Sequence, residues 1–215
     1  MKAAKNYNHW LAGLVGENIP SGTGKIVDFG AGNGMFARML QAKTGKSVLC
    51  VEPAENMRPY LGGLKSVSSL AEISDNSQDF VYSLNVLEHI EDDCRVLMQL
   101  FQKLRPGGRI ILYVPAFPCL YSSMDKAVGH FRRYRRAELI DKVQSVGFTV
   151  EYCRYADFAG WFAAGLFKLL RGRNGALKPG AVRLYDSLIF PLSRAADVLT
   201  GGRLLGKNLI LSAGR

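Results

Sequence analysis

Short apolar runs alternate with helix-like segments along most of this 215-residue chain, and this alternation constrains its fold more than any other feature. The apolar runs lie at 26–29, 47–53, 80–84, 109–115 and 148–155. The segments with helical spacing lie at 6–16, 35–44, 54–61, 91–105 and 136–146. Strands that alternate with helices form βαβ units and a mostly parallel sheet. We therefore expect an α/β fold with a doubly wound sheet, in a single domain over residues 1–215.

The alternation breaks at residues 155–206, which are rich in bulky apolar and basic types. This segment precedes a last expected strand at Leu209–Ser212, so we expect a helical insertion before that strand. Lys168, Pro191 and Arg194 interrupt its apolar runs, which therefore fall short of the roughly 20 residues that span a bilayer. Three roles stay open: a lid over the chain's own active site, a platform for a lipid-linked substrate or an anionic membrane surface, and a dimer contact.

Charge is distributed unevenly along the chain. Residues 1–100 carry 9 basic and 11 acidic side chains, whereas residues 101–215 carry 19 and 7. A basic half is typical of proteins that meet nucleic acid, an anionic membrane or an anionic substrate, and it also fits a solvated basic surface. No zinc finger or RNA-recognition signature is present, so we expect no nucleic-acid partner. The oligomeric state stays open.

The four cysteines stand far apart, with no CxxC pair. This spacing argues against a structural zinc site and against a disulfide framework, so the sequence predicts no metal. The first residues lack the apolar region of a secretory signal. We therefore expect a cytoplasmic protein with reduced thiols, peripheral at the inner face of a membrane if 155–206 is a membrane platform.

A glycine-rich loop joins the first apolar run to the helix that follows it, over residues 27–34 (VDFGAGNG). Glycines permit a tight turn and close approach of a ligand, although turns without ligands are also glycine-rich. The spacing is GxGxG, not GxGxxG, and Asp28 lies two residues before the first glycine. A carboxylate there is a poor neighbour for a diphosphate and a good one for a cation. Glu52 closes the next strand, where an acid can accept both hydroxyls of a ribose. Together these residues suit a nucleoside that carries an amino-acid tail.

Four blocks now show a resemblance: DFGAGNG, CVEPAENM, SLNVLEHIED and LRPGGRIILYVP, in this order. They resemble the class I S-adenosylmethionine-dependent methyltransferases of the small type 11/12 kind. The resemblance implies a Rossmann-like sheet of seven strands with the last strand antiparallel. It also implies S-adenosylmethionine as the cofactor and S-adenosylhomocysteine as the product.

The resemblance also implies roles for individual residues. Asp28 would lie near the amino group of the methionine part, and Glu52 would hold the ribose. Ser69 stands where the family often has an Asp for the adenine amino group, so its hydroxyl would make that contact more weakly. The implied cofactor-binding residues are Asp28, Gly30, Ala31, Gly32, Gly34, Glu52, Pro53, Met57, Ser69, Asn85 and Leu87.

A second block, Gly129–Tyr134, resembles a subgroup of these enzymes that has a GHxRRY segment on the substrate side. An imidazole, two guanidinium groups and a phenol suit an anionic substrate such as a carboxylate or a phosphate. A solvated helix start is the alternative reading. The candidate substrate-binding residues are Tyr121, His130, Arg132, Arg133 and Tyr134.

Methyl transfer needs mainly the positioning of the two reactants, with a general base if the acceptor is a hydroxyl or an amine. His130 is the first candidate for that base and His89 the second, although His89 suits a structural role equally well. Tyr121, Asp125 and Tyr134 are weaker candidates, and a carboxylate acceptor needs no base. The sequence thus predicts a methyltransferase acting on a small or amphiphilic, anionic substrate.

Three other functions are weighed against this one. A protein of the same fold would bind S-adenosylmethionine or a partner without turnover. A nicotinamide-dependent oxidoreductase is disfavoured by the GxGxG spacing and by Asp28. A nucleic-acid methyltransferase is disfavoured because residues 85–88 read NVLE rather than an NPPY-type tetrapeptide.

Overall fold

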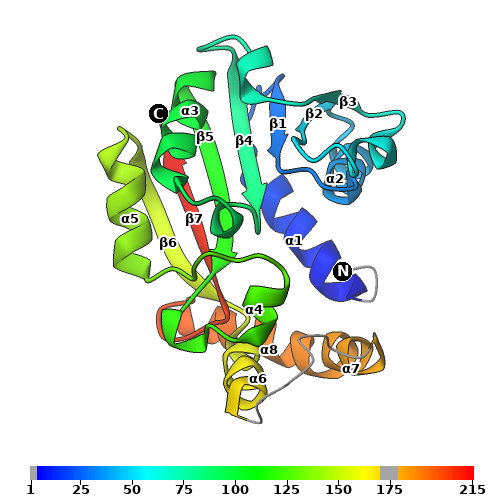
Figure 1. Cartoon of the computed structure of the whole chain (residues 1–215), viewed down its shortest axis with the longest axis vertical. Coiled ribbons are helices and arrows are strands. Elements are labelled where there is room, and N and C mark those ends of the chain that lie inside the picture. Colours follow the sequence, from blue (N-terminus) through cyan, green and yellow to red (C-terminus); the bar gives the residue numbers. More distant parts are fainter. Residues whose placement is uncertain (1–3, 170–178) are drawn as a thin grey trace.

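A computed structural model describes residues 4–169 and 179–215. Within these residues seven strands form one sheet in the order β3-β2-β1-β4-β5-β7-β6. Only β7 runs antiparallel to its neighbours β5 and β6. The strands are β1 Ile26–Phe29, β2 Val48–Val51, β3 Lys65–Val67, β4 Gln78–Leu84, β5 Leu104–Pro115, β6 Thr149–Ala156 and β7 Asn208–Gly214. This sheet, shown in Figure 1, confirms the expected α/β class and the antiparallel last strand.

Helices connect the strands and cover both faces of the sheet. They are α1 Lys5–Glu17, α2 Met35–Thr44, α3 Asp93–Lys103, α4 Ser123–Ala127, α5 Arg136–Ser145, α6 Phe158–Leu169, α7 Pro179–Leu184 and α8 Phe190–Thr200. Single 3-10 turns lie at η1 Arg58–Leu61, η2 Leu70–Glu72, η3 Leu87–His89 and η4 Pro118–Leu120, and η5 Tyr185–Ile189 is a π-helical turn.

The core has two halves, one on each face of the sheet. On one face, Leu97 and Leu100 of α3 pack with Leu139 and Val143 of α5 against the strands. On the other, α1 and α2 contribute apolar side chains that include Leu11 and Leu40. The inward spacing of these residues on their helices buries apolar area and stabilises the layered fold.

Two local expectations need correction. The helix expected at 54–61 is only the 3-10 turn Arg58–Leu61, because Pro59 restricts the backbone and Gly62 and Gly63 follow directly. The strand expected at 109–115 begins earlier, since Leu104 already pairs with Gln78 across an irregular register. The Pro106–Gly108 turn residues therefore lie inside β5 rather than before it.

The segment between β6 and β7 is helical where it is described, and α6, α7 and α8 lie together at one end of the molecule (Figure 1). Residues 170–178 of the expected insertion lie outside the described residues. Two buried carboxylates attach the segment: Asp197 accepts from the N–H groups of Asp157 and Phe158 at the start of α6, and Asp186 accepts from those of Asn6 and Tyr7. Such carboxylates satisfy the free donors of a helix start. No helix in the described ranges combines the length and the apolar character needed to cross a membrane.

Candidate functional site

The glycine loop begins where β1 ends and leads into α2. Gly30 has φ +78°, and a Cβ there would lie 2.3 Å from a methyl group of Val86. Gly34 has φ +71°, and its Cβ would meet Leu64 at 2.5 Å. At Gly32, with φ +54°, no described atom lies within 4 Å of such a Cβ. The loop thus needs glycine for its own packing and leaves open space above Gly32, where a ligand can approach the backbone.

Asp28 lies on β1 with 3% of its surface exposed. Among the described residues, its Oδ2 has no hydrogen-bond partner. Burial raises the pKa of Asp28 to about 7. Tyr82 is a hydrogen-bonding neighbour of this carboxyl. A buried carboxylate oxygen without a partner is still costly, and a cationic group beside it would remove that cost.

Glu52 follows β2 and reaches the same loop. Its Oε2 accepts from the Gly32 N–H at 2.6 Å, and its Oε1 accepts from the Ala54 N–H at 2.9 Å. Each carboxylate oxygen has room for a second donor. Glu52 therefore both holds the glycine loop and keeps acceptor capacity for the hydroxyls of a ligand.

A cavity of about 190 Å³ lies beside these two strand ends. Of the expected cofactor-binding residues, Pro53 and Ser69 line it, whereas Met57 does not and is 38% exposed. The Ser69 hydroxyl accepts from the Ala71 N–H, so its oxygen already caps η2. The complete lining is Phe29, Val51, Pro53, Ser68, Ser69, Leu70 and Gln99.

The third expected cofactor segment follows β4. Asn85 is half-buried with φ +55°, and its N–H donates to the Tyr113 carbonyl. Leu87 has no exposed surface and belongs to the core, so its side chain does not face the site. The Tyr7 hydroxyl of α1 lies 3.0 Å from the Tyr113 hydroxyl, which brings α1 close to the end of β5, the strand beside β4.

A second cavity, of about 270 Å³, lies at the predicted substrate block. Three of the expected substrate residues line it: Tyr121, Arg132 and Arg133. Pro118 and Phe131 complete the lining. The structure thus brings most of this block to one hollow.

The charges of this block are paired within the protein. Arg133 Nε donates to Asp125 Oδ1 at 2.8 Å, and Arg132 Nη1 lies 3.3 Å from Asp93 Oδ2. Tyr134 has no exposed surface, and its hydroxyl donates to the same Asp93 oxygen. Burial alone would raise the pKa of Asp93, but hydrogen bonds from Lys142 and Tyr134 outweigh burial and lower it. The two arginines therefore offer less free charge than their spacing suggests, and Tyr134 supports the block from inside.

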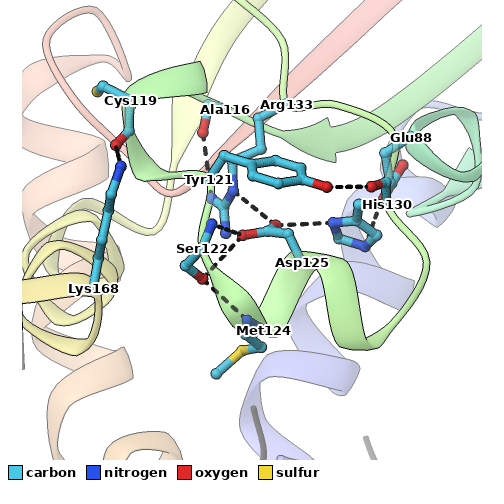
Figure 2. A network of polar contacts seen from close by, with 10 residues as sticks. All are labelled: Glu88, Ala116, Cys119, Tyr121, Ser122, Met124, Asp125, His130, Arg133 and Lys168. Atoms are coloured by element: carbon cyan, nitrogen blue, oxygen red, sulfur yellow. Dashed lines mark hydrogen bonds and ion pairs between the residues drawn. The ribbon is translucent and has the colours of Figure 1, made fainter. Parts of the chain in front are cut away.

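Glu88, His89 and His130 gather beside this cavity. His130 lies between two carboxylates, with Nδ1 2.9 Å from Asp125 Oδ1 and Nε2 3.8 Å from Glu88 Oε1 (Figure 2). The rings of His89 and His130 are 4.6 Å apart and nearly perpendicular. Burial raises the pKa of Glu88 to about 8, and burial together with His130 lowers the pKa of His89.

Asp125 holds this arrangement in place. Burial alone would raise its pKa, but hydrogen bonds from His130 and Arg133 lower it well below its usual range. Its Oδ2 also accepts from the Ser122 N–H at the start of α4. A fixed, ionised acceptor at Nδ1 orients the His130 ring.

Gln99 and Glu88 are polar residues of these sites to which the sequence assigns no role. Gln99 lies on α3 and reaches the smaller cavity only through the packing of α3 against η2, which no local pattern shows. Glu88 stands in the SLNVLEHIED block, which gives it no role of its own. Glu88 lies between β4 and α3, and no local pattern predicts its proximity to His130, which lies 42 residues later.

Comparison with known proteins gives three findings. Residues 3–152 match a family model described as a methyltransferase domain. Over 114 residues the chain is 32% identical to a probable S-adenosylmethionine-dependent methyltransferase of Mycolicibacterium smegmatis, which covers 51% of this chain and 42% of that protein. Over 161 residues it is 27% identical to a chloroplastic tocopherol O-methyltransferase of Arabidopsis thaliana, covering 69% and 45%. The chain thus spans less than half the length of both relatives.

Among solved structures, a SAM-dependent methyltransferase from Archaeoglobus fulgidus superposes with a TM-score of 0.66 at 17% identity. The match covers 97% of this chain and 94% of that one. At 17% identity this likeness shows the fold alone.

Proposed function

Because this chain belongs to the family of methyltransferase domains, we propose that it transfers the methyl group of S-adenosylmethionine to a small or amphiphilic, anionic acceptor. The observation that carries this proposal is the edge of the sheet at β1 and β2. There a buried Asp28, whose Oδ2 has no hydrogen-bond partner among the described residues, lies beside an open glycine loop and Glu52. This donor set fits a cofactor with a cationic amino group and a ribose.

Each part of this cofactor has a matching group in the chain. When bound, S-adenosylmethionine supplies a methyl group already activated by its sulfonium. Asp28 would compensate the amino group of the methionine part, and Glu52 would accept from the ribose hydroxyls. The cavity lined by Pro53 and Ser69 would take the adenine, with Gln99 as a further polar contact. Asn85 would line the methionine part.

The acceptor is assigned to the cavity of Tyr121, Arg132 and Arg133. Glu88, His89 and His130 stand beside it and are the groups we assign to act on the acceptor atom. An anionic group would approach the partly exposed guanidinium of Arg132, whose side chain is 27% exposed. Tyr134 is assigned a supporting role, because its hydroxyl is buried against Asp93.

We further propose that α6, α7 and α8 dock on an anionic membrane surface, which suits an amphiphilic acceptor. Large apolar side chains face solvent at intervals of three or four residues on these helices, among them Phe162, Leu166, Leu169, Leu184, Leu188 and Leu192. The exposed charges described in the segment, Lys168, Arg183 and Arg203, are all positive, whereas Asp157, Asp186 and Asp197 are buried. An apolar face with basic neighbours is typical of interfacial helices. The similarity to a tocopherol O-methyltransferase supports a lipophilic hydroxyl acceptor.

The test is methyl transfer from labelled S-adenosylmethionine into a fractionated cell extract, with organic and aqueous phases counted separately. We expect protein-dependent label in the organic phase, and its loss with the Glu52→Gln variant. Label in neither phase, with protein that binds the cofactor, would contradict the enzymatic proposal and favour a binding protein of the same fold.

A further inference from the structure

Three potential metal ligands converge from two segments of the chain that are far apart in sequence. Glu88 and His89 belong to η3 after β4, and His130 follows α4. One ligand atom from each lies within 4.8 Å of the other two. The sequence predicts no metal, because that prediction considers only the spacing of the cysteines. Neither of these two segments alone has a metal-binding pattern.

The carboxylate of Glu88 is the first sign that something binds between these side chains. Glu88 has no exposed surface, and among the described residues neither of its oxygens has a hydrogen-bond partner. Its nearest described ion-pair contact is His130 Nε2, at 3.8 Å, which is too long for a hydrogen bond. Buried polar atoms are nearly always paired, so two empty oxygens on one buried carboxylate call for a ligand.

The orientation of His130 is the second sign. Its Nδ1 faces Asp125, which Arg133 and Ser122 hold in place (Figure 2). Asp125 is an acceptor, so we assign the Nδ1 hydrogen to this contact; in that tautomer the Nε2 lone pair points towards Glu88. A carboxylate behind the imidazole is the arrangement that orients metal-binding histidines and strengthens them as ligands. The gap of 3.8 Å between His130 Nε2 and Glu88 Oε1 leaves a place for a cation.

We infer that Glu88, His89 and His130 bind one divalent transition-metal ion. Two imidazoles and one carboxylate suit the metals from manganese to zinc, whereas magnesium and calcium prefer oxygen ligands alone. Ligand bonds of about 2.1 Å would draw the three atoms to roughly 3–3.5 Å from one another. His89 is exposed whereas Glu88 is buried, so the His89 ring supplies most of this closing movement.

The site leaves coordination positions open. Three protein ligands hold a metal without completing its shell, as in metal sites that bind a substrate or water. Phe131, the residue after His130, lines the cavity together with Tyr121 and Arg133, so the cavity lies next to the three ligands. An oxygen of a bound acceptor would therefore reach the metal, an arrangement that rests on the proposed function, whereas metal binding itself does not.

The experiment is a calorimetric titration of tag-free, EDTA-treated protein with Zn²⁺ and with Mn²⁺, followed by Co²⁺ with visible absorbance as a report on the ligand set. We expect one ion per chain. His89→Ala, His130→Ala and Glu88→Gln should each weaken binding by about tenfold or more. His9→Ala is the matched control, because His9 is the chain's third histidine and lies exposed on α1.

Thermal melting of each variant shows whether it is folded, and His89→Ala, at an exposed position, keeps the test valid if a buried variant fails. Unchanged affinity in folded His89→Ala and His130→Ala, or no binding of any of the three ions to the folded wild type, would overturn the metal site. Since no methyl transfer is measured, this result is independent of the proposed activity.

Discussion

At the scale of single residues, the buried carboxyl of Asp28 fits a ligand with a cationic group. An Asp carboxyl has an unperturbed pKa near 3.9, and burial raises the pKa of Asp28 to about 7. In the free protein, Asp28 therefore stays protonated across most of the acidic range. The proton must leave when a cationic group binds beside it. A bound cationic group thus offsets the free-energy cost of burying the Asp28 carboxylate.

We predict that affinity for S-adenosylhomocysteine, which carries the same amino group, rises with pH by up to about tenfold per unit between pH 5 and 7 and is flat above. The Asp28→Asn variant should bind more weakly and show no such rise.

The stability of the free protein changes with pH in the opposite direction to the affinity. The folded state binds the proton more tightly, so the free wild type loses stability relative to Asp28→Asn as pH rises from about 4 to 7. Calorimetry and urea unfolding at several pH values measure both, and a pH-independent wild-type affinity would count against Asp28 as the cationic contact.

Gly30 gives a second prediction at this scale. Gly30→Ala brings a Cβ to 2.3 Å from Val86 at φ +78°, whereas Gly45→Ala meets no described atom within 4 Å at φ +69°. The backbone conformation alone costs about 1–2 kcal/mol, which Gly45→Ala should show in urea unfolding. Gly30→Ala should cost about 1–3 kcal/mol more, because Val86 must move. If both variants lost the same free energy of unfolding, Val86 would have moved aside at no cost, which would contradict this prediction.

At the scale of elements, the helices after β6 are positioned by buried carboxylates rather than by apolar packing alone. Asp157 adopts φ +64° and accepts from the Ser193 hydroxyl and the Tyr185 hydroxyl, while Asp197 caps the start of α6. These bonds fix the segment to the end of β6. The apolar side chains outside this network stay exposed.

Vesicle sedimentation tests that exposed surface. We expect the protein to sediment with phosphatidylglycerol vesicles more than with phosphatidylcholine vesicles. Leu199→Glu and Leu169→Glu, at positions 87% and 78% exposed, should each reduce sedimentation by about tenfold, as expected for losing one buried leucine. Met98→Glu, an exposed apolar position on α3, is the control and should bind as the wild type does. No binding to either lipid would contradict the membrane proposal and favour a lid over the chain's own site.

The elements were predictable where a local pattern specifies them. The glycine loop, α2 with its Gly45 end and α5 with its Gly147 end follow from short-range periodicity and stop signals. The α4 turn and β3 are too short for such a signal. The pairing of Glu88 with His130 and of Tyr134 with Asp93 depends on tertiary contacts across about forty residues, which spacing alone does not encode.

At the scale of the whole molecule, one sheet places two sites at the ends of its parallel strands. The β1 and β2 ends hold Asp28 and Glu52, and the segment after β5 contributes the His130 loop and the cavity that we propose for the acceptor. Ligands in open α/β sheets bind outside the carboxyl ends of the strands, where the strand order reverses. The antiparallel β7 completes the sheet between β5 and β6 and leads back from the α6–α8 segment.

We propose above that the 28–34 loop and Glu52 bind a nucleoside that carries an amino-acid tail. Calorimetric titration of folded, metal-free protein with S-adenosylmethionine and S-adenosylhomocysteine measures this binding. We expect one binding site per chain for each compound, with affinity weakened at least about tenfold by Glu52→Gln through the lost charge-assisted hydrogen bonds. No heat with either compound, on protein whose circular dichroism shows a folded α/β structure, would contradict it.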